Sequence, residues 1–171
     1  MTMIRLAERE LNTRYGRFNE YLYYDGQAES IALVMGDVRD GSDIPCRIHS
    51  ACIGGHVFNS VECECAAEMA AAQRVIRDAG RGVIIYLDQE GKGNGHLALV
   101  KSIPFKLEGI SQAEAYEKAG YSADARSYRP VGAILSDLGV ISIELLTENA
   151  AKADDLRGIG ITISNVKPVG D

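Results

Sequence analysis

Residues that could carry chemistry concentrate in one short segment of the sequence, 47–65. It contains three of the four cysteines, two of the three histidines and an arginine. Cys52, Cys63 and Cys65 follow the spacing Cys-x10-Cys-x-Cys. Thiolates are preferred zinc ligands, and a site with three protein ligands leaves a fourth position open for water. Because no second Cys or His pair completes a closed structural site, the segment predicts a hydrolytic zinc centre. Buried thiols that pack as small apolar side chains are the alternative.

A predicted strand and a predicted helix position this segment. The strand that precedes it is expected to carry Cys52 to its end. Residues 66–79 are alanine-rich with an apolar stripe at helical spacing, and a glycine follows them as a typical helix stop. Cys63 and Cys65 would then stand just before a helix N-terminus, whose positive end favours thiolate over thiol. The fourth cysteine, Cys46, lies on the strand itself and is expected to pack.

A glycine-rich loop, 88–96, follows a predicted buried strand at 82–87. Glycines there let the backbone approach a ligand closely, as phosphate-binding loops do. The loop is not a P-loop, because the spacing before Lys92 is wrong and no Ser or Thr follows that lysine. A plain surface turn is the alternative.

The rest of the chain predicts alternating strands and helices, which indicates an α/β fold. Pro104 is expected to end a short helix before it, and Ser111 with Glu114 forms a capping box for the next helix. The loop that contains Asp124 and Arg126 could hold an exposed ion pair of little energetic value. The expected strands cover 13–18 and 20–24 (meeting at Asn19), 30–38, 46–49, 82–87, 142–147 and 159–164. The expected helices cover 66–79, 97–101, 111–120, 131–139 and 152–157.

Length and composition favour one acidic domain spanning 1–171. The chain has 171 residues, 46% hydrophobic residues and a net charge of -6, which argues against a general nucleic-acid or anionic-membrane surface. No apolar run approaches the roughly twenty residues that span a bilayer, and residues 1–10 lack the apolar core of a signal peptide. A cytoplasmic location is therefore expected, where thiols hold metal more often than they form disulfides.

Several motifs together resemble the GTP cyclohydrolase II family, from about Thr13 to about Ile163. They are Arg47-Ile-His-Ser-Ala-Cys52, Cys63-Glu-Cys65, Tyr86-Leu-Asp-Gln-Glu-Gly-Lys92, Asp124-Ala-Arg126 and Leu145-Leu-Thr-Glu-Asn149. The resemblance implies a single α/β domain, with a mixed central β-sheet flanked by helices and the site at the strand ends. It also implies a homodimer, a zinc ion in each chain, and GTP as the purine nucleotide substrate.

The resemblance also implies a role for each matching residue. Cys52, Cys63 and Cys65 match the zinc ligands, and Asp124 and Arg126 match the family's proton acceptor and nucleophile. The matching substrate-binding positions are Arg47, His49, Ser50, Glu68, Glu90, Gly91, Lys92, Thr147 and Lys152, of which Thr147 and Lys152 would hold phosphates.

In the implied reaction, Arg126 attacks the α-phosphate of GTP and releases pyrophosphate. Zinc-bound hydroxide then attacks C8 and opens the imidazole ring, and a second hydration releases formate. An arginine is normally a poor nucleophile because its pKa exceeds about 12, so this role requires a carboxylate such as Asp124 beside it. Mg²⁺ is expected to compensate the charge of the phosphates.

Several positions depart from the family pattern. The family's catalytic tyrosine is replaced by Ile103, which cannot donate a proton; Tyr116 and Tyr121 could replace it only if the fold brings them back. Glu68 replaces a glutamine, so an acceptor-only group stands where one that donates and accepts is usual. Lys92 replaces an arginine and loses bidentate phosphate contact. The other departures are His56 for an aspartate, Glu62 for an arginine, and Asn94 and His96 for apolar residues.

Three hypotheses follow. The first is a zinc-dependent hydrolase that opens the purine ring of GTP, or of a related nucleotide, and stops at a formamidopyrimidine because Ile103 cannot assist the second step. The second is an ordinary GTP cyclohydrolase II of riboflavin synthesis, which releases formate. The third is a catalytically silent zinc- or nucleotide-binding module that regulates a partner.

Overall fold

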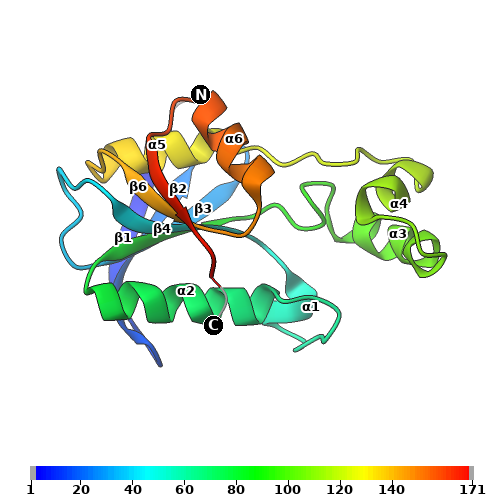
Figure 1. Ribbon diagram of the computed structural model, residues 1–171, viewed down its shortest axis with the longest axis horizontal. Helices are drawn as coiled ribbons and strands as arrows, with labels where there is room; N and C mark the ends of the chain where they lie inside the picture. Colours follow the sequence, from blue (N-terminus) through cyan, green and yellow to red (C-terminus); the bar gives the residue numbers. More distant parts are fainter. Residues whose placement is uncertain (1–2, 170–171) are drawn as a thin grey trace.

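The computed structural model describes residues 3–169, which form a seven-stranded sheet with helices on both faces (Figure 1). The strands are β1 (Ile4–Thr13), β2 (Gly16–Tyr24), β3 (Glu29–Met35), β4 (Ile44–Ser50), β5 (Gly82–Leu87), β6 (Ile143–Leu146) and β7 (Ile163–Lys167). The helices are α1 (Ile53–His56), α2 (Cys65–Ala79), α3 (His96–Leu107), α4 (Gln112–Lys118), α5 (Arg129–Asp137) and α6 (Ala150–Gly158). The predicted α/β class and mixed central sheet are confirmed.

The sheet has an antiparallel half and a parallel half. Its strand order is β1-β2-β3-β5-β4-β6-β7; β1, β2, β3 and β5 pair antiparallel, whereas β5, β4, β6 and β7 pair parallel. In the parallel half, the carboxyl ends of β4, β5 and β6 meet at one edge of the sheet. Ligand sites in α/β sheets lie at such an edge, and the candidate site described below begins there.

Two apolar clusters fix the helices to the two faces of the sheet. On one face, α5 and α6 pack against the side chains of Val83 and Ile85 on β5. On the other face, Ala72 and Ile76 of α2 pack against Ile84 of the same strand. The alternation along β5 follows from the period of two in a strand, and because both faces are covered, the strand reads as a continuous apolar run. Figure 1 shows α2 beneath the sheet and α5 and α6 above it.

The α3–α4 pair stands beyond the strand ends and covers neither sheet face (Figure 1). Residues Ala98 and Ser102 of α3 are buried, and Gln112 of α4 donates a hydrogen bond to the Ser102 hydroxyl over 2.9 Å. The predicted capping box at Ser111 and Glu114 is present and starts α4.

Four boundaries predicted from the sequence are wrong, one of them the end of the strand expected at 30–38, which stops at Met35. The first two strands meet at a turn between Thr13 and Gly16 instead of at Asn19, which pairs within β2. In that turn the Thr13 hydroxyl donates to the Gly16 carbonyl over 2.8 Å and accepts from the Tyr15 amide over 3.1 Å. The edge strand β1 is exposed along most of its length, so its sequence lacks the apolar alternation that would have revealed it.

The other two errors involve Pro104 and the last strand. Pro104 lies inside α3 rather than after it, because packing against α4 outweighs the one hydrogen bond that proline removes. The last strand begins at Ile163, four residues later than expected, because Gly160 takes a positive φ of 88° and closes α6. The Ile161 amide then donates to the Leu156 carbonyl over 3.1 Å, a typical helix C-cap bond.

Within residues 3–169, no helix is both long and apolar enough to cross a membrane.

Candidate active site

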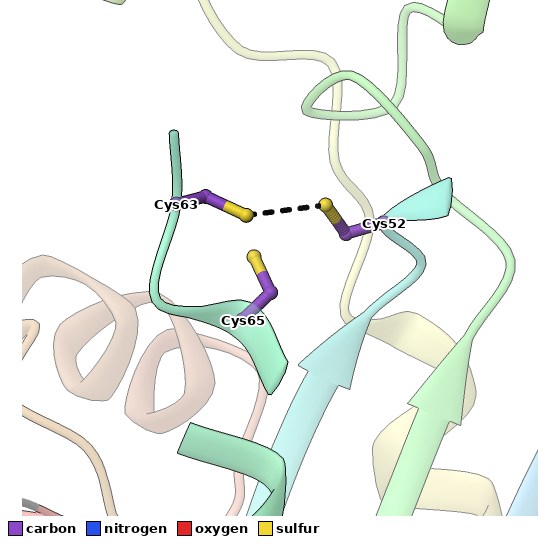
Figure 2. Close-up of side chains that lie close together, drawn as sticks. All are labelled: Cys52, Cys63 and Cys65. Atoms are coloured by element: carbon purple, nitrogen blue, oxygen red, sulfur yellow. Dashed lines mark hydrogen bonds between the residues drawn. The ribbon is translucent and has the colours of Figure 1, made fainter. Parts of the chain in front are cut away.

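The three cysteines of the Cys-x10-Cys-x-Cys pattern meet at the carboxyl end of β4. Cys52 caps α1, Cys65 is the first residue of α2, and Cys63 lies in the turn between the two helices. Their sulfur atoms all lie within 4.8 Å of one another, and the Cys52 and Cys63 Sγ atoms are 3.6 Å apart. Figure 2 shows the three side chains pointing toward a common centre.

The shape of this cluster fits a metal ion. Two thiolates on a tetrahedral zinc with bonds of about 2.3 Å stand about 3.8 Å apart, close to the spacing found here. Gly55 closes one side: a Cβ at this position would lie 3.0 Å from the Cys63 Sγ and 3.5 Å from the Cys52 Sγ. The Gly55 amide also donates to the Cys52 Sγ over 3.4 Å. This backbone approach therefore requires a glycine.

Electrostatics distinguish the clustered cysteines from the fourth one. Burial and the two neighbouring thiols raise the pKa of Cys65, and burial raises the pKa of Cys52. Three thiols this close repel one another as thiolates, so a bound cation is what would hold them deprotonated. Cys46 is fully buried in the core, where burial raises its pKa to about 12. The prediction that Cys46 packs is confirmed.

A chain of polar side chains runs from the cysteine cluster along the sheet face that α2 covers. The His56 Nε2 lies 3.0 Å from the His49 Nε2 and 3.4 Å from the Cys65 carbonyl oxygen. The Arg47 Nε donates to the His49 Nδ1 over 3.4 Å, and the Arg47 Nη2 donates to the Glu68 carboxylate over 2.5 Å. The chain thus connects the cysteine cluster to a carboxylate on α2.

The hydrogen-bond pattern assigns the histidine tautomers. Because the His49 Nδ1 accepts from Arg47, its Nε2 carries the proton and donates to His56. Burial, followed by the charge of Arg47, lowers the pKa of His49 to about 3, so this ring is neutral. Glu68, predicted to contact substrate, is paired with the buried Arg47 and lines a separate hollow on α2.

Glu90 joins the glycine loop to the cysteine segment. It is buried, and its Oε2 accepts a hydrogen bond from the Ile53 amide over 2.8 Å. Gly91 and Lys92 both take left-handed backbone conformations, with φ of 60° and 54°. A Cβ on Gly91 would lie 2.5 Å from the Gly95 carbonyl oxygen, so the turn requires glycine.

The glycine loop in turn holds the segment that carries Asp124 and Arg126. The Ala125 amide donates to the Lys92 carbonyl over 2.9 Å, and the Asn94 side-chain amide donates to the Ser122 carbonyl over 2.9 Å. These contacts place two segments some thirty positions apart in the sequence side by side.

Asp124 and Arg126 form a two-point ion pair. The Arg126 Nε donates to the Asp124 Oδ1 over 2.9 Å, and the Arg126 Nη2 donates to the Asp124 Oδ2 over 2.5 Å. The Asp124 side chain is 41% exposed, as in the exposed pair that the sequence allowed, whereas the Arg126 side chain is only 18% exposed. Although burial opposes it, hydrogen bonding from Arg126 lowers the pKa of Asp124, and Asp124 raises that of Arg126.

Two buried cations lie behind the strand ends. Arg47 donates through Nη1 to the Leu146 carbonyl over 3.0 Å, and the Lys152 Nζ donates to the Ile48 carbonyl over 3.2 Å. Burial, followed by the charges of Arg47 and Arg126, lowers the pKa of Lys152 to about 8. Thr147, also buried, accepts through its hydroxyl from the Asn149 amide over 3.1 Å at the start of α6.

A cavity of about 350 Å³ opens beside the cysteine cluster. It is lined by residues from the cysteine segment, the glycine loop, the α3–α4 pair and Arg126. Of the predicted site residues, Ser50, Cys52, Cys63, Cys65, Glu90, Gly91, Lys92, Ile103 and Arg126 line it. Arg47, His49, Glu68, Asp124, Thr147 and Lys152 lie outside this lining.

The sequence interpretation missed Gly55 and Gln89. Gln89 donates to the Ser50 hydroxyl over 3.1 Å and accepts from the Ser127 amide over 3.1 Å, so it bridges β4 to the Arg126 loop. For Gly55 the glycine pair next to Cys52 was a usable signal; for Gln89 no local pattern indicated a partner 38 residues away.

Comparison with known proteins agrees with this geometry. The GTP cyclohydrolase II family model matches residues 4–168. A GTP cyclohydrolase-2 of Streptomyces coelicolor is 38% identical over 168 residues, covering 96% of this chain and 76% of that protein. A GTP cyclohydrolase-2 of Actinobacillus succinogenes is 36% identical over 167 residues and is covered to 77%.

Longer proteins also match. The riboflavin biosynthesis protein RibBA of Salinispora tropica is 40% identical over 163 residues, which cover 93% of this chain and 40% of that protein. The crystal structure of RibBX, a two-domain 3,4-dihydroxy-2-butanone 4-phosphate synthase of A. baumannii, superposes with a TM-score of 0.54 at 20% identity. It covers 99% of this chain and 41% of that chain, and it shows a shared fold. On the family match and the close relatives, the chain belongs to the GTP cyclohydrolase II family of enzymes.

Proposed function

We propose that this protein is a zinc-dependent hydrolase that opens the imidazole ring of GTP and releases pyrophosphate. The observation that carries the proposal is the cluster of three cysteine sulfurs, all within 4.8 Å of one another, on the wall of a cavity that also contains Arg126. Membership of the GTP cyclohydrolase II family supports GTP as the substrate. The acting unit is the whole chain, 1–171, as a homodimer.

Cys52, Cys63 and Cys65 would hold the zinc ion. When bound, zinc would supply a Lewis acid and an activated water for attack at C8 of the guanine, which is otherwise poorly electrophilic. The Gly55 amide donates to the Cys52 sulfur, and buried His49 holds the half-buried His56, whose Nε2 lies 3.4 Å from the Cys65 carbonyl oxygen. These contacts fix the orientation of the cysteine ligands, as the hydrogen-bond partners of metal ligands commonly do.

Arg126 and Asp124 would act on the phosphates. A guanidinium nitrogen of Arg126 attacks the α-phosphorus, the bond between the α-phosphorus and the bridging oxygen breaks, and pyrophosphate leaves. Asp124, already bonded to two nitrogens of Arg126, takes the proton that the new P–N bond displaces. A water later hydrolyses that P–N bond and returns the arginine. Lys92 at the cavity and the more deeply buried Arg47, Thr147 and Lys152 complement the phosphates, with Mg²⁺ as counterion.

Ile103 determines where the reaction ends. One water adds at C8 and the C8–N9 bond breaks, which leaves a formyl group on N7. Ile103 lines the cavity and offers no proton for the second hydration, so we propose that the product is a formamidopyrimidine nucleotide.

The test is incubation of the zinc-loaded protein with GTP, followed by mass spectrometry and assays for formate and pyrophosphate. The proposal predicts one pyrophosphate and one formamidopyrimidine per GTP, with formate well below stoichiometric amounts. Ile103→Tyr should shift the product toward released formate, and Leu99→Tyr, which places the same hydroxyl one turn earlier on α3 in the cavity lining, should not. Stoichiometric formate from the unchanged protein would indicate the ordinary cyclohydrolase reaction, and unchanged GTP would contradict both.

A further inference from the structure

Tyr116 presents a buried phenol to the cavity beside the cysteine cluster. The residue is 1% exposed, lies on α4, and lines the same cavity as Cys52, Ile103 and Arg126. Its hydroxyl has no hydrogen-bond partner among residues 3–169, whereas the Tyr23 hydroxyl, outside the cavity lining, donates to Asp137 over 2.7 Å. Among the described residues, the fully buried side-chain polar atoms without a partner are the Gln73 Oε1 and the Tyr128 hydroxyl; the Tyr116 hydroxyl is not one of them, because it opens onto the cavity. The phenol of Tyr116 therefore has a free donor where a ligand would lie.

The glycine loop leaves room for this hydroxyl. A Cβ built on Gly91 would come within 3.4 Å of the Tyr116 hydroxyl oxygen, so the phenol stands directly over the loop backbone. Glu90, Asp124, Arg126 and Cys52 are the charged or ionisable groups that act on it. Burial is the main effect and raises the pKa of Tyr116, followed by Glu90 and Asp124. The hydroxyl thus keeps its proton and is available as a donor.

Hydrogen bonds at both ends of α4 hold Tyr116 in place. The capping box at Ser111 and Glu114 starts α4, and the Tyr121 amide closes the helix on the Tyr116 carbonyl over 2.9 Å. Gln112 ties α4 to Ser102 of α3, the residue next to Ile103. Tyr116 and Ile103 therefore come from neighbouring helices and contribute one polar and one apolar side chain to the same cavity.

We propose that the Tyr116 hydroxyl donates a hydrogen bond to the purine nucleotide in this cavity and serves the ring-opening step. The inference rests on the proposed function, since it assumes that the base of GTP occupies this cavity. Attack at C8 places negative charge on the ring nitrogens, and a fixed donor in a site shielded from water stabilises such charge. Within the proposed function, the second hydration lacks the donor that a tyrosine at position 103 would supply, and the step assigned to Tyr116 is the first one, the opening of the ring.

The experiment compares the zinc-loaded unchanged protein with Tyr116→Phe and Tyr121→Phe. Phenylalanine keeps the ring of Tyr116 and removes only its hydroxyl, and Tyr121 is the matched control because it lies outside the cavity lining. We expect Tyr116→Phe to lower the kcat for ring opening by about 10²-fold, with zinc content, Tm and product identity unchanged. Tyr121→Phe should stay within about 2-fold of the unchanged protein.

GTP binding, measured by calorimetry on the same proteins, separates the two proposals. If the unchanged protein binds GTP without opening it, the proposed function fails, and a loss of affinity of at least about 5-fold in Tyr116→Phe alone still supports the hydrogen bond. Equal turnover, or equal affinity in the absence of turnover, for Tyr116→Phe and the unchanged protein would overturn the inference. A protein that does not bind GTP at all would overturn both.

Discussion

The two walls of the cavity are built in different ways. The cysteine wall, from Cys52 to Cys65, is local: its three sulfur atoms come from fourteen consecutive residues between β4 and α2. The opposite wall is assembled from distant parts of the chain, because the glycine loop must be joined to the Asp124–Arg126 segment through Lys92 and Asn94. The first wall would hold a metal and the second would present the groups that act on the nucleotide. Local spacing therefore specifies the cysteine cluster, and long-range hydrogen bonds specify how the other groups are aligned with it.

Removing one sulfur from the cysteine wall should have the largest effect. Cys63→Ser is expected to lose most of its zinc and at least ~10³-fold in turnover, because two thiolates hold zinc poorly and leave no activated water. Metal analysis after dialysis and a GTP assay measure this. Cys46→Ala is the control: it removes a thiol outside the cluster and should lose about 1 kcal/mol of stability while keeping its zinc. Full zinc occupancy in Cys63→Ser would contradict the assignment of the site.

A smaller effect is expected from the backbone of the same wall. Gly55→Ala places a methyl group 3.0 Å from the Cys63 sulfur and should weaken zinc binding by about 10–100-fold. Gly54→Ala is the matched control, since its nearest neighbour would be the Ser60 Cβ at 3.7 Å, an ordinary contact. Competition with a zinc chelator measures both affinities. Equal affinities for the two variants would show that the close approach of Gly55 does not shape the site.

The buried Lys152 side chain should make kcat/KM for GTP depend on pH. Because the pKa of Lys152 is lowered to about 8, this side chain is charged below pH 8 and loses its charge as the pH rises. If it attracts the phosphates, kcat/KM for GTP should decline above about pH 8, since kcat/KM reports the free enzyme. Lys152→Gln keeps a donor for the Ile48 carbonyl and removes the charge. This variant should have a lower kcat/KM for GTP at pH 7, and its kcat/KM should not decline above pH 8. If its kcat/KM declines as much as that of the unchanged protein, the titrating group is not Lys152.

The smallest effect is expected where the glycine loop is hydrogen-bonded to the segment that carries Asp124 and Arg126. Asn94→Ala removes the bond to the Ser122 carbonyl and should lower stability by about 1 kcal/mol, or about 2–4 °C in Tm for a chain of this length. Turnover should fall several-fold with zinc retained, because the Arg126 loop loses one of its attachments. Asn165→Ala, which removes a surface bond to Glu144 far from the cavity, should leave turnover unchanged. If both variants behave alike in the GTP assay, Asn94 does not align that segment.

The sequence alone determined the family, the α/β class and the position of the cysteine cluster. These rest on short-range signals: the apolar runs of β4 and β5, the stripe and glycine stop of α2, and the spacing of Cys52, Cys63 and Cys65. The same signals placed the capping box of α4 and the buried position of Cys46 correctly. They failed at β1 and at Pro104, where an exposed edge and helix packing outweigh local preference.

Only the tertiary structure decided which residues share the cavity. It places Tyr116 and Ile103 in the same cavity because α4 packs against α3, and it pairs Glu68 with Arg47 because Arg47 lies next to Ile84 on the sheet face that α2 covers. It also gives Gln89 its two partners and fixes Arg126 against Asp124. Such contacts depend on how far apart the helices and strands lie after packing. Neither the periodicity nor the spacing of residues along the chain encodes that distance. The cysteine pattern could thus be recognised in the sequence, whereas the groups that share the cavity with it could be identified only from the fold.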